Sequence, residues 1–381
     1  MHPTSVSDAV RLRAPRWDLF CRVVDHLGDA AIGWRLARQL AREHGLRPRL
    51  WIDRPEVLGE LVPGAVPGIE IDGVAIERWD DDDPRLAAPA PESVADVVVA
   101  LLAGTPPDGY RAAMRVRRPV WVAYEYLSAE PWVASCHGLP SPKADGLVEH
   151  FFFPGFEPGT GGLLRECDLP DRIEAFDTDP AARHAFLASI GVASEPHMRF
   201  AALLCYPDSP VAALLDAFAA RPERWRVLLP PALHRTGRYH PVALEVPFVP
   251  QHDYDRLLGC CDLVFVRGED SFVRALWSGR PMVWQIYRQA ELAHRPKLQA
   301  FLAHWIRVAA PPEAAAAALK GLHAAWNGTE PASDTPPLDT ALHAVLDSLG
   351  ALRDAAGRWR RLQAEHPDAA SSLVAFIERR L

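Results

Sequence analysis

The chain has 381 residues, 49% of which are hydrophobic, and a net charge of −8 at pH 7. Because this length exceeds that of a typical domain, we expect two domains with separate cores. The acidic balance argues against a nucleic-acid binder, which needs positive charge to neutralise phosphates, and the lack of a run of about 18 apolar residues argues against a membrane protein.

The cysteines and the N-terminal segment favour a cytoplasmic protein. No two of the six cysteines have CxxC spacing, and six in a chain this long do not make a disulfide scaffold. Residues 1–17 contain no apolar core, so we expect no signal peptide.

The first predicted elements form a strand–helix–strand unit. In chain order they are a strand over 17–24, a loop over 25–31, a helix over 32–44 and a strand over 49–52. Gly45 is suited to end the helix. The loop contains Asp25 and Asp29, so two carboxylates are predicted at a strand-to-helix turn, where open α/β sheets bind ligands.

Alternation of strands and helices continues along the chain. We predict strands over 68–79, 94–104 and 119–127, an irregular region over 128–166, and a helix ending at Ile190 with Asp179 as its N-cap and Pro180 as its first residue. A second series follows, with strands over 198–206, 224–229 and 243–248, helices over 210–220 and 252–259, and a largely helical tail over 340–381.

The segment from Cys261 to Tyr287 is the most informative part of the second series. Its apolar start predicts a buried strand, Gly268 a sharp turn, and Gly279 with Pro281 the end of a helix. Glu269, Asp270 and Ser271 therefore fall at a helix N-terminus, which is a position that binds phosphates.

Two series of about 180 residues predict an α/β protein with two facing, doubly wound, Rossmann-like domains, as in GT-B glycosyltransferases. We expect a first Rossmann-like domain over 1–180, a second over 181–355, and a C-terminal helix over 356–381 that can pack back on the first domain.

Five sequence blocks between residues 17 and 287 resemble one family, the elongation factor P arginine rhamnosyltransferases (EarP). The blocks are WDLFCRVVDHLGDAAIGWRLARQL, EYLSAEPWV with CHGLPSP, FFFPGFEPGTGGLL, PFVPQHDYDRLL and CDLVFVRGEDSFVRALWSGRPMVWQIY. The resemblance implies a GT-B enzyme that transfers L-rhamnose from dTDP-β-L-rhamnose to an arginine of elongation factor P, with inversion and with neither metal nor cofactor. It also implies that 1–180 is the acceptor-side domain and 181–355 the nucleotide-sugar-binding domain.

The resemblance also implies roles for nine residues. Asp29 resembles the catalytic base, Asp25 its essential partner, and Glu269 an essential glutamate. The residues implied in donor binding are Arg267, Asp270 and Ser271 for the diphosphate and ribose, Phe248 and Gln251 for the thymine, and Tyr206. The chain departs from the family pattern at His26, Ala30, Ala31 and Leu204; the last puts one stacking contact with the base in doubt.

Other interpretations remain open at this point. A GT-B enzyme with another acceptor, or a non-catalytic module that binds the translation factor, would share much of the pattern. Taken alone, Asp25 and Asp29 could be ordinary loop and N-cap residues. The acidic run over 80–83 resembles a metal-binding DxD motif, although a solvated loop explains it better.

Overall fold

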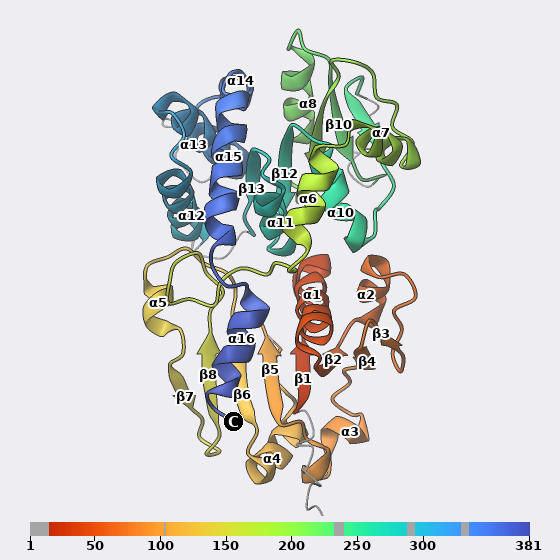
Figure 1. Ribbon diagram of the computed structural model, residues 1–381, viewed down its shortest axis with the longest axis vertical. Coiled ribbons are helices and arrows are strands. Elements are labelled where there is room, and N and C mark those ends of the chain that lie inside the picture. Colours follow the sequence, from red (N-terminus) through yellow and green to blue (C-terminus); the bar gives the residue numbers. More distant parts are fainter. Residues whose placement is uncertain (1–14, 103, 232–239, 288–293, 329–334) are drawn as a thin grey trace, which may run out of the picture.

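The protein consists of two units stacked along the long axis, each built on its own sheet (Figure 1). The computed structural model describes residues 15–102, 104–231, 240–287, 294–328 and 335–381. The first sheet has eight strands in the order β3-β4-β2-β1-β5-β6-β8-β7, and the second has five in the order β11-β10-β9-β12-β13.

The first sheet is parallel except at its two edges, where β3 pairs with β4 and β7 with β8 in antiparallel fashion. Its strands are β1 (Arg16–Cys21), β2 (Arg47–Ile52), β3 (Glu70–Ile71), β4 (Val74–Arg78), β5 (Val97–Leu101), β6 (Val120–Tyr124), β7 (Pro140–Pro142) and β8 (Val148–Phe152). The accompanying helices are α1 (His26–His44), α2 (Pro55–Leu61), α3 (Pro84–Ala87), the 3-10 helix η1 (Pro91–Ser93), α4 (Asp108–Arg117) and α5 (Trp132–Cys136).

The second sheet is parallel throughout. Its strands are β9 (Arg199–Leu203), β10 (Trp225–Leu229), β11 (Ala243–Glu245), β12 (Leu263–Arg267) and β13 (Met282–Gln285). The helices of this part are α6 (Leu169–Asp177), α7 (Pro180–Ser189), α8 (Val211–Ala219), α10 (Gln251–Gly259), α11 (Asp270–Ser278), α12 (His294–Ala309), α13 (Glu313–Asn327), α14 (Leu338–Asp347) and α15 (Leu349–Ala364).

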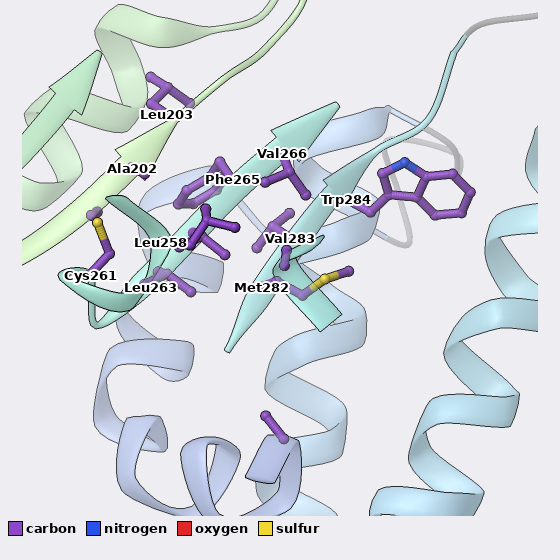
Figure 2. Packing of buried hydrophobic residues seen from close by; sticks show 14 of the residues in the cluster. Ala202, Leu203, Leu258, Cys261, Leu263, Phe265, Val266, Met282, Val283 and Trp284 are labelled. Carbon is purple, nitrogen blue, oxygen red and sulfur yellow. The ribbon is translucent and has the colours of Figure 1, made fainter. Parts of the chain in front are cut away.

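Burial on both faces explains why β12 is an unbroken apolar run. Val264, Phe265 and Val266 are all inaccessible to solvent, although successive side chains point to opposite faces of a strand. Figure 2 shows Phe265 and Val266 of β12 near Val283 of the neighbouring strand β13. Each large apolar side chain buried in this way stabilises the fold by about 1.5–3 kcal/mol.

The last helix, α16 (Ala369–Glu378), lies on the first unit rather than the second (Figure 1). Its buried Ala369, Leu373 and Ile377 belong to the same hydrophobic cluster as residues of β1 and α1. Helix α6, by contrast, places Leu169 and Ile173 in the larger cluster of the second unit. The division of the chain at residue 180 stays a prediction.

Most predicted elements are present, and three predictions were wrong. The single helix predicted over 356–381 is the end of α15 and a separate α16, because Pro367 and the capping Asp368 begin a new helix. Helix α1 begins at His26, not at residue 32, so Asp25 is its N-cap and Asp29 lies in its first turn. The region 128–166 is not irregular throughout, because it contains α5, β7 and β8. Strands β7 and β8 contain Pro, His and Glu, and this composition hid the edge strand β7 and its neighbour β8 from the apolar pattern.

No helix in the described ranges is both long and apolar enough to cross a membrane. All six cysteines are free thiols.

Candidate functional site

A cavity of about 300 Å³ lies where the carboxyl ends of the two sheets face each other. Figure 1 shows α1 of the first unit below α6, α10 and α11 of the second. Both units line the cavity, with Asp25, Leu27, Gly28, Ala31 and Leu61 from the first and Leu204, Phe248, Gln251, Arg267, Asp270 and Ser271 among those from the second.

Part of the lining of this cavity suits a flat, partly polar ring. Apolar side chains dominate there, including Leu204 in place of the expected aromatic residue and Phe248, which is 49% exposed. The Gln251 amide donates a hydrogen bond to the carbonyl of Ala31 at 3.1 Å. Its Oε1 is buried without a hydrogen-bond partner in the part of the chain that the structure describes, so it can accept from a ligand such as a base N–H.

Another part of the lining is charged and joins the two units directly. Arg267 at the end of β12 donates to Asp25 Oδ1 at 3.2 Å, and its guanidinium lies 4.8 Å from the ring centroid of Tyr206. The Tyr206 hydroxyl in turn donates to Asp25 Oδ2 at 3.4 Å. These contacts place an acid of α1 against two predicted donor-binding residues.

Gly268 makes this close approach possible. Its φ of +65° lies in the left-handed region, and a Cβ added there would come within 2.8 Å of Asp25 Oδ2. Because a real Cβ does not approach an oxygen so closely, a side chain at 268 would displace the Asp25 carboxylate.

Asp29 is held by the start of its own helix. Its Oδ2 accepts the backbone N–H groups of Val24 at 2.7 Å and Asp25 at 2.8 Å, and the residue is only 2% exposed. Burial raises the pKa of Asp29, the two backbone donors oppose that rise, and the charges of Asp25 and Asp53 add to it. Asp29 does not line the cavity itself but fixes the loop that presents Asp25.

Glu269 lies at the N-cap of α11 and reaches the first unit, where its Oε2 accepts the N–H of Leu127 at 3.0 Å. Burial raises the pKa of Glu269 to about 7, while Lys297 and the Leu127 amide oppose the rise and Asp29 and Asp270 add to it. A group that titrates near neutrality is a common feature of active sites.

Asp270 and Ser271 line the cavity in the first turn of α11, where backbone N–H groups lack helical partners. One carboxylate oxygen of Asp270 already accepts from Arg35 of α1 at 2.6 Å. The structure therefore brings together at this cavity seven of the nine predicted residues: Asp25, Phe248, Gln251, Arg267, Asp270 and Ser271 line it, and Tyr206 contacts Asp25. Asp29 and Glu269 do not line the cavity. Each accepts a backbone hydrogen bond from a neighbouring loop, Asp29 from the loop that follows β1 and Glu269 from the loop that follows β6.

A buried ionic network beside the site was missed from the sequence. Glu166 accepts from Arg35 at 3.1 Å and from Arg274 at 2.6 Å, and both arginines are almost fully buried. Burial alone would raise the pKa of Glu166, but the two guanidinium charges hold it well below its usual range. The available signal was the spacing of Arg35 and Gln39 with Ile32, which puts polar side chains on the buried stripe of α1.

Across the described residues, the structure has no group of three or more His, Cys, Asp or Glu placed to hold a metal ion. In the acidic run over 80–83, Asp83 caps α3 through the N–H of Arg85, and Asp81 accepts from the indole of Trp79. This run therefore has local structural partners.

Comparison with known proteins identifies the family. Residues 17–378 match the family model described as Elongation-Factor P (EF-P) rhamnosyltransferase EarP, which confirms the resemblance predicted from the sequence. A protein-arginine rhamnosyltransferase of Pseudomonas putida is 43% identical over 387 residues, covering 96% of this chain and 99% of the relative.

Solved structures agree with this assignment. One that gives the structural basis for EarP-mediated arginine glycosylation of translation elongation factor EF-P is 31% identical, with a TM-score of 0.64 over 96% of this chain and all of that one (100%). The glycotransferase of kitacinnamycin matches at a TM-score of 0.53 and 14% identity over 97% of this chain and 100% of its own, a likeness of fold alone. The predicted GT-B fold is confirmed.

Proposed function

The chain belongs to the elongation factor P rhamnosyltransferase (EarP) family, and from this membership we propose that it is a protein-arginine rhamnosyltransferase. The donor is dTDP-β-L-rhamnose and the acceptor an arginine of elongation factor P in the cytoplasm. Transfer inverts the anomeric centre and uses no metal or cofactor. The observation that carries this proposal is the contact of Asp25 with Arg267, which sets acids of one unit beside the nucleotide pocket of the other.

The cavity supports a thymidine diphosphate sugar as donor. Its apolar end accommodates the base next to Phe248, with the unpartnered Gln251 Oε1 available to the N–H of the thymine. The diphosphate then lies toward Arg267 and the first turn of α11, where the guanidinium and the free backbone N–H groups stabilise negative charge.

The acid cluster formed by Asp25, Asp29 and Glu269 supports a guanidinium as acceptor, since planar N–H donors pair well with carboxylates. Free arginine has a pKa of about 13.8, so preparing a neutral guanidine at pH 7 would cost about 9 kcal/mol. A carboxylate is too weak a base to remove the guanidinium proton before the reaction begins. Proton removal is therefore coupled to bond formation, because the nitrogen becomes acidic only as it bonds to the sugar.

In this mechanism an acceptor nitrogen attacks the anomeric carbon from the face opposite the diphosphate. The carbon–oxygen bond to the diphosphate breaks as the carbon–nitrogen bond forms. We assign the released proton to Asp29, the base that the family resemblance implies; because Asp29 lies next to Asp25 but does not line the cavity, the loop at Asp25 must shift for this transfer. Asp25 and Glu269 align the guanidinium, and alignment of this kind is worth several kcal/mol. Arg267 and the N–H groups near Ser271 stabilise the charge that develops on the leaving group.

The test is to incubate the protein with dTDP-rhamnose and purified elongation factor P, and to weigh the intact factor. We expect a mass gain of one deoxyhexose residue that maps to a single arginine. Donor consumption without modification of the factor would indicate another acceptor. Binding of the factor with no transfer under any condition would instead indicate a non-catalytic module.

A further inference from the structure

One cation beside the acid cluster has no place in the mechanism above. Lys297 of α12 is one of only three lysines in the chain and is half-buried. Its Nζ lies 5.8 Å from the ring centroid of Tyr126, in the loop that follows β6 of the first unit. An ammonium at that distance is within range of a cation–π interaction.

Glu269 holds the next residue of the same loop. Its carboxylate accepts the N–H of Leu127, so two side chains of the second unit, one cationic and one acidic, contact consecutive residues of the first. Lys297 and Glu269 therefore meet the first unit at neighbouring positions of one loop. Tyr126 is 36% exposed. Partial burial raises the pKa of its hydroxyl, and the charges of Asp29, Glu269 and Asp25 raise it further.

Apart from Lys297, the charges that act on Glu269 disfavour its ionised form. Asp29 of α1 and Asp270 of α11 both raise the pKa of Glu269, and the hydroxyls of Tyr124 and Tyr126 interact with its charge. Arg35 and Arg274 line a small cavity together with Glu269, but they are already paired with Asp270 and Glu166. Burial raises the pKa of Glu269, and Lys297 opposes that rise more strongly than the hydrogen bond from the Leu127 amide does. Burial lowers the pKa of Lys297 in turn, and Glu269 and Glu130 counteract that lowering.

We propose that Lys297 is a positioning residue of the transfer site, whose ammonium keeps Glu269 anionic and turned toward the loop at Tyr126 and Leu127. The inference rests on the proposed function, since an anionic Glu269 is needed to pair with an acceptor guanidinium. Lys297 itself touches neither reacting atom in this account. It acts through Glu269, and its loss leaves Glu269 close to Asp29 and Asp270 without an opposing cation of its own, because Arg35 is already paired with Asp270.

The experiment measures kcat and KM for elongation factor P from pH 5.5 to 9, with the full-length protein, for wild type, Lys297→Met and Lys297→Arg. Because a nearby opposite charge lowers a carboxyl pKa by about one to three units, we expect Lys297→Met to move the acidic limb of the profile upward by about one pH unit or more. Activity lost at pH 7 should return at higher pH. Lys297→Arg retains the charge and should keep the limb close to that of wild type.

Lys320→Met serves as the matched control, because Lys320 is exposed on α13 and its removal changes the net charge equally. If Lys297→Met does not fold, Lys297→Gln carries the same expectation. An equal loss of kcat at every pH, with the limb unmoved, would show a purely structural residue and overturn the inference. Failure of wild-type protein to modify the factor would instead refute the proposed function.

Discussion

Replacing Gly268 by alanine tests the contact on which the site depends. Two effects are expected. The left-handed backbone at φ +65° costs an alanine roughly 1–2 kcal/mol of folding stability. In addition, the new Cβ at 2.8 Å from Asp25 Oδ2 forces that carboxylate away from Arg267 and Tyr206. A shift of about 1 Å in a catalytic group can lower turnover on the order of 100-fold.

Gly45→Ala is a control that separates the two effects. Gly45 also has a φ of +65°, but a Cβ there would meet nothing within 4 Å. We expect similar losses of stability for both variants in urea unfolding, and a drop in rhamnose transfer only for Gly268→Ala. The reasoning would be refuted if both variants turned over alike, since Gly268 would then not set the position of Asp25.

Three further predictions concern individual residues. Asp29→Asn should abolish transfer and leave dTDP-rhamnose affinity nearly unchanged, because an asparagine oxygen can still accept the two backbone N–H groups; wild-type-like turnover would remove Asp29 as the base, and Asp53→Asn is the control for lost charge. Arg267→Ala should weaken dTDP binding about 10- to 100-fold by loss of a charged hydrogen bond, and unchanged affinity in calorimetry would contradict this. Glu269→Gln should gain stability relative to wild type as the pH rises from 4.5 to about 7, because the native glutamate binds a proton in that window that the unfolded chain has released; a difference independent of pH would show that Glu269 ionises normally.

Much of the fold followed from local patterns. The apolar run of β12, the left-handed Gly279 and the capping pair Asp179 and Pro180 appear where the sequence predicts them. The start of α1 was misjudged because Asp25 and Asp29 resemble loop residues. The Asp29 carboxylate in fact accepts two N–H groups at the helix start and so stabilises the extra turns.

The sequence indicated which residues form the site but not which of them contact each other. Acids and an arginine at the ends of two strands indicated which residues matter. The pairing of Asp25 with Arg267, 242 positions apart in the chain, depends on how the two units stack, which local patterns do not encode. The partners of Lys297 and Arg35 carry no local signal either, because each side chain contacts a residue of the opposite unit.

A crystal structure with dTDP-rhamnose bound tests the central claim most directly, namely that acids of the first unit lie beside the reactive carbon of a donor held by the second. The account predicts the thymine near Phe248 and Gln251, and the anomeric carbon facing Asp25 and Asp29 with room for a guanidinium between them. A sugar directed away from both aspartates, with the units in the contact described, would contradict it.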